Sequence, residues 1–587
     1  MAKNYIVSDY YSEFVKNNLE NCHFHSFAAM QSNGIKDCLK CFDQKNWENR
    51  NTIIDNWDYT FQKQKRLSKI ISERLSLHFK YNYSNKFWNY LFSLNLLKYI
   101  TILYNFFSIV EKEFRTNKFL INELNLKKVD PCCNFESTTN FLNINKIGKE
   151  FLLTIYYLNF IKKENYPPEF EENTVGSQAI SISKTFKTFK KFISQKSVSY
   201  DKLKVGIIGS FFDHKTLNQL KEKSGFKISD LSLPPSNKSS SRSTLLRSKI
   251  FDDFDEMDRF DKFFLSCSKF IFPTDLIEDL DFNLSKHENF LNKLRNLEYI
   301  VSEAWLGSTE INIFRSIAFE KKSVKTLYNE HNCFFHPYLG GLVEFQSNLV
   351  DQYLTMGWNN KNPKFITTSS LFPFTFNRKT KSKIKYLYVS YPIIESKTFY
   401  TSLYSNSDYS GYVHLLFVQK FFSLLEDHFL NQISYRGYPK DYNVKLSILG
   451  KEYFLKNYLD KMNILPSLKF SGPSCREQIA SSELVIIDRP STAYLESLHM
   501  NIPTICFFDP TTMFLSEEHN DFFDDLIDAK IVHTTPDSAS RHLIEVFESP
   551  QDWWQSKKVQ DLKNKWLKRN FGKPDVLVNY LLNLAQQ

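Results

Sequence analysis

The sequence predicts an α/β protein in which a helical N-terminal region precedes two doubly wound parallel sheets. Two observations carry this prediction. Short apolar runs alternate with helical patterns in two successive blocks of the chain, and polar residues follow many of the apolar runs directly. Strands that alternate with helices are typical of parallel sheets covered by helices on both faces. We expect a helical region over residues 1–165, a first α/β domain over 166–383 and a second over 384–587.

The composition is that of an ordinary globular chain with several domains. At 587 residues the chain is too long for one core, and 42% hydrophobic and 24% charged residues are unremarkable values. Positive and negative side chains are interspersed and the net charge is only +10, so no nucleic-acid partner is expected. A mild basic excess suits phosphorylated donors and anionic membrane surfaces. The first residues have no apolar signal segment, which favours a cytoplasmic location.

Two long helices are expected in the N-terminal region. Apolar residues recur every three or four positions in Ile53–Phe79 and again in Phe87–Phe114. The most apolar run, Leu91–Val110, contains polar side chains such as Asn95 and Lys98. Because such groups are costly at bilayer depth, we interpret this run as a buried helix and not as a membrane span.

Four residues near the N-terminus have the spacing of a zinc knuckle: Cys22, His25, Cys38 and Cys41. The alternative is that these small thiols fill a helical core, and the intervening Phe-Ala-Ala-Met favours the alternative. No Asp-x-Asp motif stands at the end of an expected strand. We therefore expect catalysis without a metal ion, with arginines and helix N-termini stabilising the charge of the leaving group.

Two basic segments allow more than one interpretation. Lys184–Ile193 alternates phenylalanines with lysines, so it suits either a peripheral contact with the inner membrane or a helix that packs its Phe face inward; the second is favoured. The loop Leu233–Thr244 and the residues after it carry Arg242 and Arg247. A lid that closes over phosphates is one interpretation, and a surface loop is the favoured one.

In the first α/β domain, three expected strands end in candidate catalytic residues. These are Asp213 after the strand 204–209, Glu303 at the end of the strand 299–303, and His331 after the strand 325–328. A neutral His331 would take a proton from an acceptor hydroxyl, and its protonated form would donate to a leaving phosphate oxygen. Glu303 suits a general base or a nucleophile. Each residue also has a structural alternative, as a buried hydrogen-bonded histidine or as a helix-capping carboxylate.

The second domain contains the most informative segment. A buried strand over Leu484–Ile487, a polar turn and a short helix are followed by another buried strand, Thr504–Phe508. Ligands of such sheets bind at the carboxyl ends of the strands, and helix N-termini attract anions. The donor phosphate is therefore expected beside the turn residues, and the ribose one helical turn further on. The predicted contacts are Arg489, Ser491 and Thr492 for the phosphate and Glu496 for the ribose.

A second donor contact is expected earlier in this domain. Arg436 and Tyr438 follow a long helix over Tyr412–Leu430 and precede an expected strand over Lys445–Ile448. A guanidinium there suits bidentate binding of a phosphate or of a sugar carboxylate.

Several segments resemble a family of transferases encoded in bacterial O-antigen and surface-polysaccharide clusters. They are Asn46–Arg50, Tyr83–Trp88, Phe335–Trp358, Ser491–Pro510, His533–Pro536 and Trp553–Gln560. The family is similar to GT-B glycosyltransferases and, more distantly, to Kdo and other CMP-sugar transferases. The resemblance implies two Rossmann-like domains of GT-B type, facing one cleft, and a nucleotide-sugar donor, CMP-linked donors included. It also implies a surface-polysaccharide or lipid-linked glycan as acceptor, and no separate cofactor.

The expected function is therefore a metal-independent glycosyltransferase at the inner face of the cytoplasmic membrane. Two enzymatic alternatives on the same architecture are a polyol-phosphate transferase and a sugar-nucleotide epimerase. A third alternative is an inactive assembly or docking protein. One difference from the family supports this third alternative. After the strand that ends at Tyr328, relatives tend to have Gln-His-Gly-Gly, whereas this chain has Glu330-His331-Asn332-Cys333.

Overall fold

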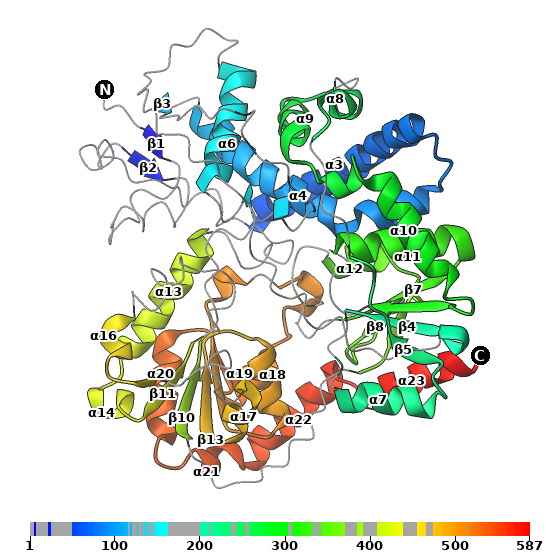
Figure 1. Cartoon of the computed structure of the whole chain (residues 1–587). Helices are drawn as coiled ribbons and strands as arrows, with labels where there is room; N and C mark the ends of the chain where they lie inside the picture. Colours follow the sequence, from blue (N-terminus) through cyan, green and yellow to red (C-terminus); the bar gives the residue numbers. More distant parts are fainter. Residues whose placement is uncertain are drawn as a thin grey trace.

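The chain folds into a helical region and two α/β units, which Figure 1 shows at the top, at the right and at the lower left. This computed structural model describes residues 50–114, 118–119, 146–161, 200–209, 214–235, 242–252, 257–302, 308–330, 342–369, 384–390, 408–437, 455–464, 474–513, 515–573 and 575–587, the short strands 5–7 and 22–24, and some single positions. The predicted fold class, a helical region followed by two parallel-sheet units, is confirmed.

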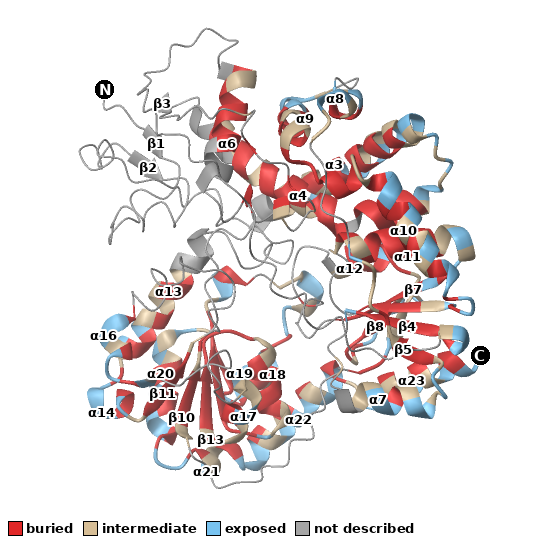
Figure 2. Ribbon diagram, in the orientation of Figure 1, coloured by how far each residue is buried: buried red, intermediate tan, exposed pale blue. Residues whose placement is uncertain are grey.

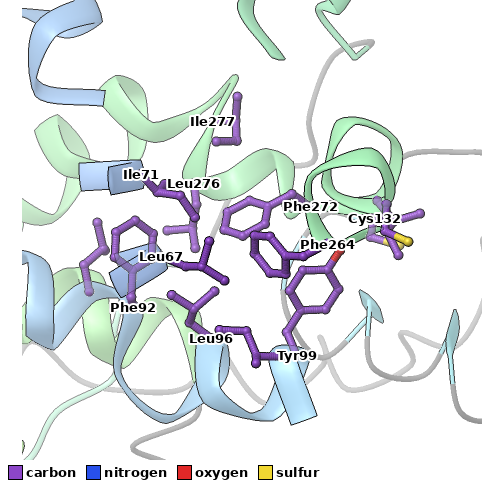
Figure 3. Packing of buried hydrophobic residues seen from close by; sticks show 14 of the residues in the cluster. Leu67, Ile71, Phe92, Leu96, Tyr99, Cys132, Phe264, Phe272, Leu276 and Ile277 are labelled. Atoms are coloured by element: carbon purple, nitrogen blue, oxygen red, sulfur yellow. The ribbon is translucent and has the colours of Figure 1, made fainter. Parts of the chain in front are cut away.

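The helical region is built around two long helices, α3 (Arg50–Phe79) and α4 (Asn85–Phe114), as their apolar periodicity predicts. Their apolar faces meet in one large core with α9 (Arg259–Ile271), where Leu67 and Leu96 pack beside Phe264 (Figure 3). Further helices here are α6 (Lys146–Tyr156), η5 (Tyr157–Ile161) and α8 (Thr244–Phe251). The apolar part of α4 is thus buried against protein. Among the described helices, none combines the length and apolar character that a membrane crossing requires.

Three short strands precede and flank these helices. β1 (Tyr5–Val7) pairs in parallel with β2 (Cys22–Phe24) and with β3 (Lys118–Phe119). Of the zinc-knuckle candidates, Cys22 opens β2, whereas His25, Cys38 and Cys41 lie outside the described residues. The zinc interpretation and the favoured alternative both stay untested predictions. The basic segment 184–193 also lies outside the described residues.

The first α/β unit contains six parallel strands in the order β5-β4-β6-β7-β8-β9. Their bounds are β4 Val205–Ile208, β5 Ile228–Asp230, β6 Tyr299–Ser302, β7 Lys325–Asn329, β8 Gln352–Thr355 and β9 Phe365–Thr367. The helices between them are α7 His214–Lys223, α10 Leu280–Asn292, α11 Thr309–Lys322 and α12 Leu342–Asn348. The three strands expected in this unit from the sequence, β4, β6 and β7, are confirmed.

The second unit contains six parallel strands in the order β12-β11-β10-β13-β14-β15. Their bounds are β10 Ile384–Val389, β11 Ile433–Arg436, β12 Asn463–Ile464, β13 Ser482–Ile487, β14 Thr504–Phe507 and β15 Val532–His533. Its helices include α13 Asp408–Ser423, α14 Asp427–Leu430, α16 Lys456–Leu459, α17 Cys475–Ala480, α18 Thr492–His499, α19 Asp524–Asp528, α20 Pro536–Val546, α21 Pro550–Trp554 and α22 Lys557–Asn570. Figure 2 shows the central strands buried between these helices. This strand order is that of a dinucleotide-binding Rossmann sheet.

One prediction about the second unit is wrong in its detail. The sequence predicts that Arg436 lies between a helix and a strand, but Arg436 is itself the last residue of the buried strand β11. Its polar residues, Ser434 and Arg436, are buried at this position, so they hide the apolar pattern of a strand. The strand expected over 445–448 lies outside the described residues.

The chain returns to the first unit at its end. The helix α23 (Asp575–Gln586) packs on α7, β4 and β5, beside the first sheet (Figure 1). Leu577, Leu581 and Leu584 share a core with Val205 and Leu327 of that sheet. The domain expected over 384–587 includes this helix, because the amphipathic pattern of α23 does not show which sheet it covers. The boundaries at 165 and 383 stay predictions.

Candidate functional site

The candidate site lies at the carboxyl ends of β10, β11 and β13. From the central strand β10, the chain builds β11 and β12 on one side of the sheet and β13 to β15 on the other. At such a switch point the loops leave in opposite directions, and this is where ligands of parallel sheets bind. The residues that end these strands are therefore the first to consider.

Arg436 is the last residue of β11, and its side chain is only 3% exposed. Its guanidinium Nη1 donates to the side-chain oxygen of Gln478 on α17. The Arg436 side chain also forms a hydrogen bond with the Cys475 thiol, and this bond acts to lower the pKa of the thiol. Burial raises the pKa of Cys475 to about 11, so its thiol is neutral at pH 7 and is no candidate nucleophile.

The helix α17 begins with a capping box in which Ser474 and Glu477 bind each other's backbone N–H groups. This start places Arg476 in the first turn. Its Nε and Nη2 donate to Oε1 of Glu496 at 3.1 and 2.8 Å, respectively. The two helices α17 and α18 are thus joined by an ion pair beside Arg436.

Burial and two nearby arginines have opposite effects on the pKa of the Glu496 carboxyl. The side chain is buried in the middle of α18, and burial raises its pKa. The positive charges of Arg476 and Arg436 oppose this rise. Arg436 therefore lies close enough to act on Glu496, which brings together two of the predicted donor contacts. Two arginines against one carboxyl give this cluster an excess of positive charge, which suits an anionic ligand.

A second polar group lies beneath this cluster, where β13 ends. Asp488 is fully buried and accepts a hydrogen bond of 2.6 Å from the Tyr388 hydroxyl on β10. The His414 Nε2 atom on α13 lies 3.7 Å from the same carboxylate oxygen. These contacts fix the start of the turn that leads to α18.

The three predicted phosphate contacts occupy this turn. Arg489 is 4% exposed, and its guanidinium contacts the Met513 sulfur (3.3 Å) and the Thr512 carbonyl (3.4 Å) beyond β14. Ser491 is the N-cap of α18, and Thr492 is its first residue; both are partly exposed. The N-terminus of α18 thus faces the edge of the sheet where the cluster lies.

Other predicted site residues cannot be placed. Asp213, Glu303, His331 and Tyr438 lie outside the described residues, and their catalytic or binding roles stay predictions. Within the described part of the chain, no group of His, Cys, Asp and Glu side chains is arranged to hold a metal ion.

The lid interpretation of Arg247 is wrong. Arg247 lies inside α8, is 1% exposed and binds the carboxylate of Glu278 at 2.6 and 2.8 Å. Its guanidinium also donates to the Phe272 carbonyl, so it is part of the helical core. Arg242 lies at the start of this segment and contacts the Val129 and Phe270 carbonyls.

Sequence reasoning missed Arg476 and Gln478. The available signal was the pattern Ser474-x-x-Glu477, which predicts a helix start. A helix start just before a buried strand places its first turn at the carboxyl edge of a parallel sheet, beside the other candidates.

Comparison with solved structures finds distant similarities. A TarM mutant from S. aureus, in a complex that includes UDP, has 10% identity over 52% of this chain and 59% of its own, with a TM-score of 0.32. The spinosyn forosaminyltransferase SpnP has 10% identity over 66% of this chain and 100% of its own, with a TM-score of 0.36. The spinosyn rhamnosyltransferase SpnG, complexed with thymidine diphosphate, has 10% identity over 65% and 100%, with a TM-score of 0.32. This chain thus spans 59% of the TarM chain.

A search of curated proteins gives no match. A family model, in contrast, covers nearly the whole chain, from residue 22 to residue 579, and includes both sheets and the candidate site. The chain belongs to the LIC12162 family of transferases.

Proposed function

We propose that this transferase is a metal-independent glycosyltransferase that moves a sugar from a nucleotide-sugar donor to a surface-polysaccharide or lipid-linked glycan. The observation that carries the proposal is the cluster of Arg436, Arg476 and Glu496 at the switch point of the second sheet. It joins cationic groups for phosphate to a carboxylate for sugar hydroxyls, on a sheet of the kind that binds nucleotides.

In this proposal each group has a distinct contact with the donor. The N-terminus of α18, with Ser491 and Thr492, receives the phosphate together with Arg489 or Arg436. Glu496 accepts hydrogen bonds from the ribose hydroxyls. Both hydrogen bonds from Arg476 go to Oε1 of Glu496, so Oε2 lies outside them.

The reacting centre in this proposal is contributed by the first unit. His331, Glu303 and Asp213 are the candidates, since each follows a strand of the first sheet. His331 or Glu303 would remove the proton from the acceptor hydroxyl, while arginines and the α18 N-terminus stabilise the leaving phosphate.

Thermal-shift measurements with CMP-, UDP-, GDP- and dTDP-linked sugars test the donor site. A ligand at a hundredfold excess over its Kd stabilises the folded chain by about 2.7 kcal/mol. We expect one nucleotide class to raise the melting temperature of the wild type and not of Glu496→Ala. The matched control is Glu545→Ala on α20, which removes an exposed ion pair with Lys530. An unchanged shift in Glu496→Ala would refute the donor assignment.

The product then decides among the reactions. A glycosidic bond supports the proposal, whereas a phosphodiester or a free epimer identifies one of the two enzymatic alternatives. With the donor known, full turnover by His331→Ala would remove this histidine from the mechanism.

A further inference from the structure

A second functional feature lies where the chain crosses back from the second unit to the first. The crossing is the segment Phe571–Lys573, between α22 and α23. Phe571 forms an isolated antiparallel bridge with Gly357, just after β8 of the first unit. The Gly572 N–H donates to the Met356 carbonyl at 2.9 Å.

This crossing is packed without room for side chains. Gly357 has φ +130°, and a Cβ there would lie 1.8 Å from the Gly572 nitrogen. A Cβ on Gly572 would lie 2.0 Å from the Thr368 carbonyl oxygen. The backbones of the two units therefore meet directly, and neither glycine can carry a side chain unless the facing backbone shifts.

Met356 connects the two units. Its side chain is buried in the core of the second unit, with Leu387 and Phe571. Its carbonyl binds the crossing, and its backbone N–H donates to the Glu330 carboxylate at 3.1 Å. A chain of two hydrogen bonds thus runs from Glu330, through Met356, to Gly572.

Glu330 extends β7 and is only 3% exposed. Its N–H donates to the Leu354 carbonyl at 2.9 Å, which fixes the backbone against β8. The carboxylate oxygen Oε2 accepts from the Met356 amide and also from the Trp358 indole, the latter at 2.6 Å. The other oxygen, Oε1, is buried and has no hydrogen-bond partner among the described residues.

We propose that Glu330 is the positioning residue of this crossing: its carboxyl holds the Met356–Trp358 turn and, through it, the Phe571–Lys573 segment. Glu330 thus controls how firmly the second unit is attached to the first, whatever reaction the chain catalyses. Its immediate neighbour in sequence is His331, which lies outside the described residues.

The protonation state of Glu330 makes this attachment sensitive to pH. Burial raises the pKa of Glu330 to about 8, and the hydrogen bonds from Trp358 and Met356 only partly oppose this. The neutral, protonated carboxyl of Glu330 is favoured here because Oε1 is buried without a hydrogen-bond partner in the described part of the chain, and burying a negative charge there would cost free energy. The groups that face the carboxyl do not titrate near pH 8, since they are an amide and an indole. Other ionisable groups on the packed elements are the buried phenols of Tyr328 and Tyr353, the exposed Lys325 and Lys573, and His499, whose ring contacts Phe571. Burial lowers the pKa of His499 to about 4, so this histidine does not titrate between pH 6.5 and pH 9.

Hydrogen exchange of the whole chain at pH 6.5 and pH 9, corrected for the intrinsic effect of pH, tests this inference. In the wild type, we expect exchange of the peptide that contains Gly572 to rise about thirtyfold between pH 6.5 and pH 9. Opening of the crossing becomes about tenfold more favourable for each pH unit between the ordinary glutamate pKa of the opened state and the raised pKa of about 8, and it levels off above that. Peptides from β13 should not change. Glu330→Gln should protect the crossing at both pH values, because an amide oxygen accepts the same bonds without titrating. Glu330→Ala should expose the crossing at both.

The control is Gln346→Ala, which removes a buried side chain of the same unit that contacts Tyr328 and Tyr353 and not the crossing. It should lower the melting temperature and leave the crossing protected. Equal protection of the wild-type crossing at both pH values would overturn the inference, as would exposure of the crossing in Gln346→Ala. If Glu330→Ala does not fold, the comparison of wild type with Glu330→Gln decides. None of these measurements needs a substrate, so failure here is distinct from failure of the proposed glycosyl transfer.

Discussion

The Tyr388 hydroxyl donates to the Asp488 carboxylate at 2.6 Å, across the adjacent central strands β10 and β13. Both side chains are fully buried, and burial raises the pKa of Tyr388, so the phenol stays a donor at all physiological pH values. This hydrogen bond ties together the two strands from which the loops of the candidate site depart.

Tyr388→Phe should therefore destabilise the second unit. Loss of this hydrogen bond leaves a buried Asp488 oxygen without its donor, which costs about 1–3 kcal/mol of the free energy of unfolding. Tyr386→Phe is the matched control, because Tyr386 is equally buried on β10 and donates to a neutral carbonyl, that of Phe547. There we expect about 0.5–1.5 kcal/mol. Denaturant unfolding monitored by tryptophan fluorescence would compare the two, and equal losses would contradict the special role of Asp488.

Arg476→Ala should weaken nucleotide binding about tenfold or more, a change of about 1.4 kcal/mol. The reason is that Glu496 would lose the positive charge that opposes its burial, and its pKa would rise further. The affinity of the variant should consequently fall toward lower pH more steeply than that of the wild type. Titration calorimetry at pH 6 and pH 8 measures both effects. Arg569→Ala, at an exposed ion pair with Asp521, should bind like the wild type.

The buried histidines of the second unit predict sensitivity to acid. Burial lowers the pKa of His533 to about 4, and its ring nitrogens contact Ser538 and the Lys530 carbonyl. Because the unfolded chain, with an ordinary histidine pKa near 6.5, binds the proton more tightly, stability is full above pH 6.5 and falls as pH drops toward 4. His533→Gln should melt with a smaller dependence on pH across this window. A melting profile parallel to that of the wild type would exclude His533 as a source of the acid sensitivity.

Gly357→Ala should disrupt the crossing between the units. The methyl group would meet the Gly572 backbone, and the backbone conformation itself disfavours a side chain. Gly225→Ala separates these effects, because Gly225 also has a positive φ, +61°, but open space around it. We expect Gly225→Ala to cost about 1 kcal/mol and Gly357→Ala clearly more, with faster hydrogen exchange at Gly572 only in the second.

Much of the fold follows from apolar periodicity, which is strong where elements are long or fully buried. The helices α3 and α4 and the strands β4, β6, β7, β10, β13 and β14 are of this kind. The strand β11 was not predicted, because buried polar side chains interrupt its apolar pattern. The helix α23 was assigned to the wrong sheet, because an amphipathic pattern does not show which sheet a helix packs against. Of the site, the turn before α18 follows from its place at a strand end, and Arg436 from its place between a helix and an expected strand. Arg476 was not, since its role depends on a contact between two helices that are distant from Arg436 in sequence.

The return of α23 to the first sheet has a consequence for synthesis on the ribosome. The first unit cannot complete its core until Leu577, Leu581 and Leu584 have emerged, after the whole second sheet has been made. The second unit is thus free to fold first, while the sheet that precedes it in sequence still lacks the helix that packs on β4 and β5. A nascent chain stalled before residue 575 would be most vulnerable to proteases and chaperone capture in its earlier, N-terminal unit.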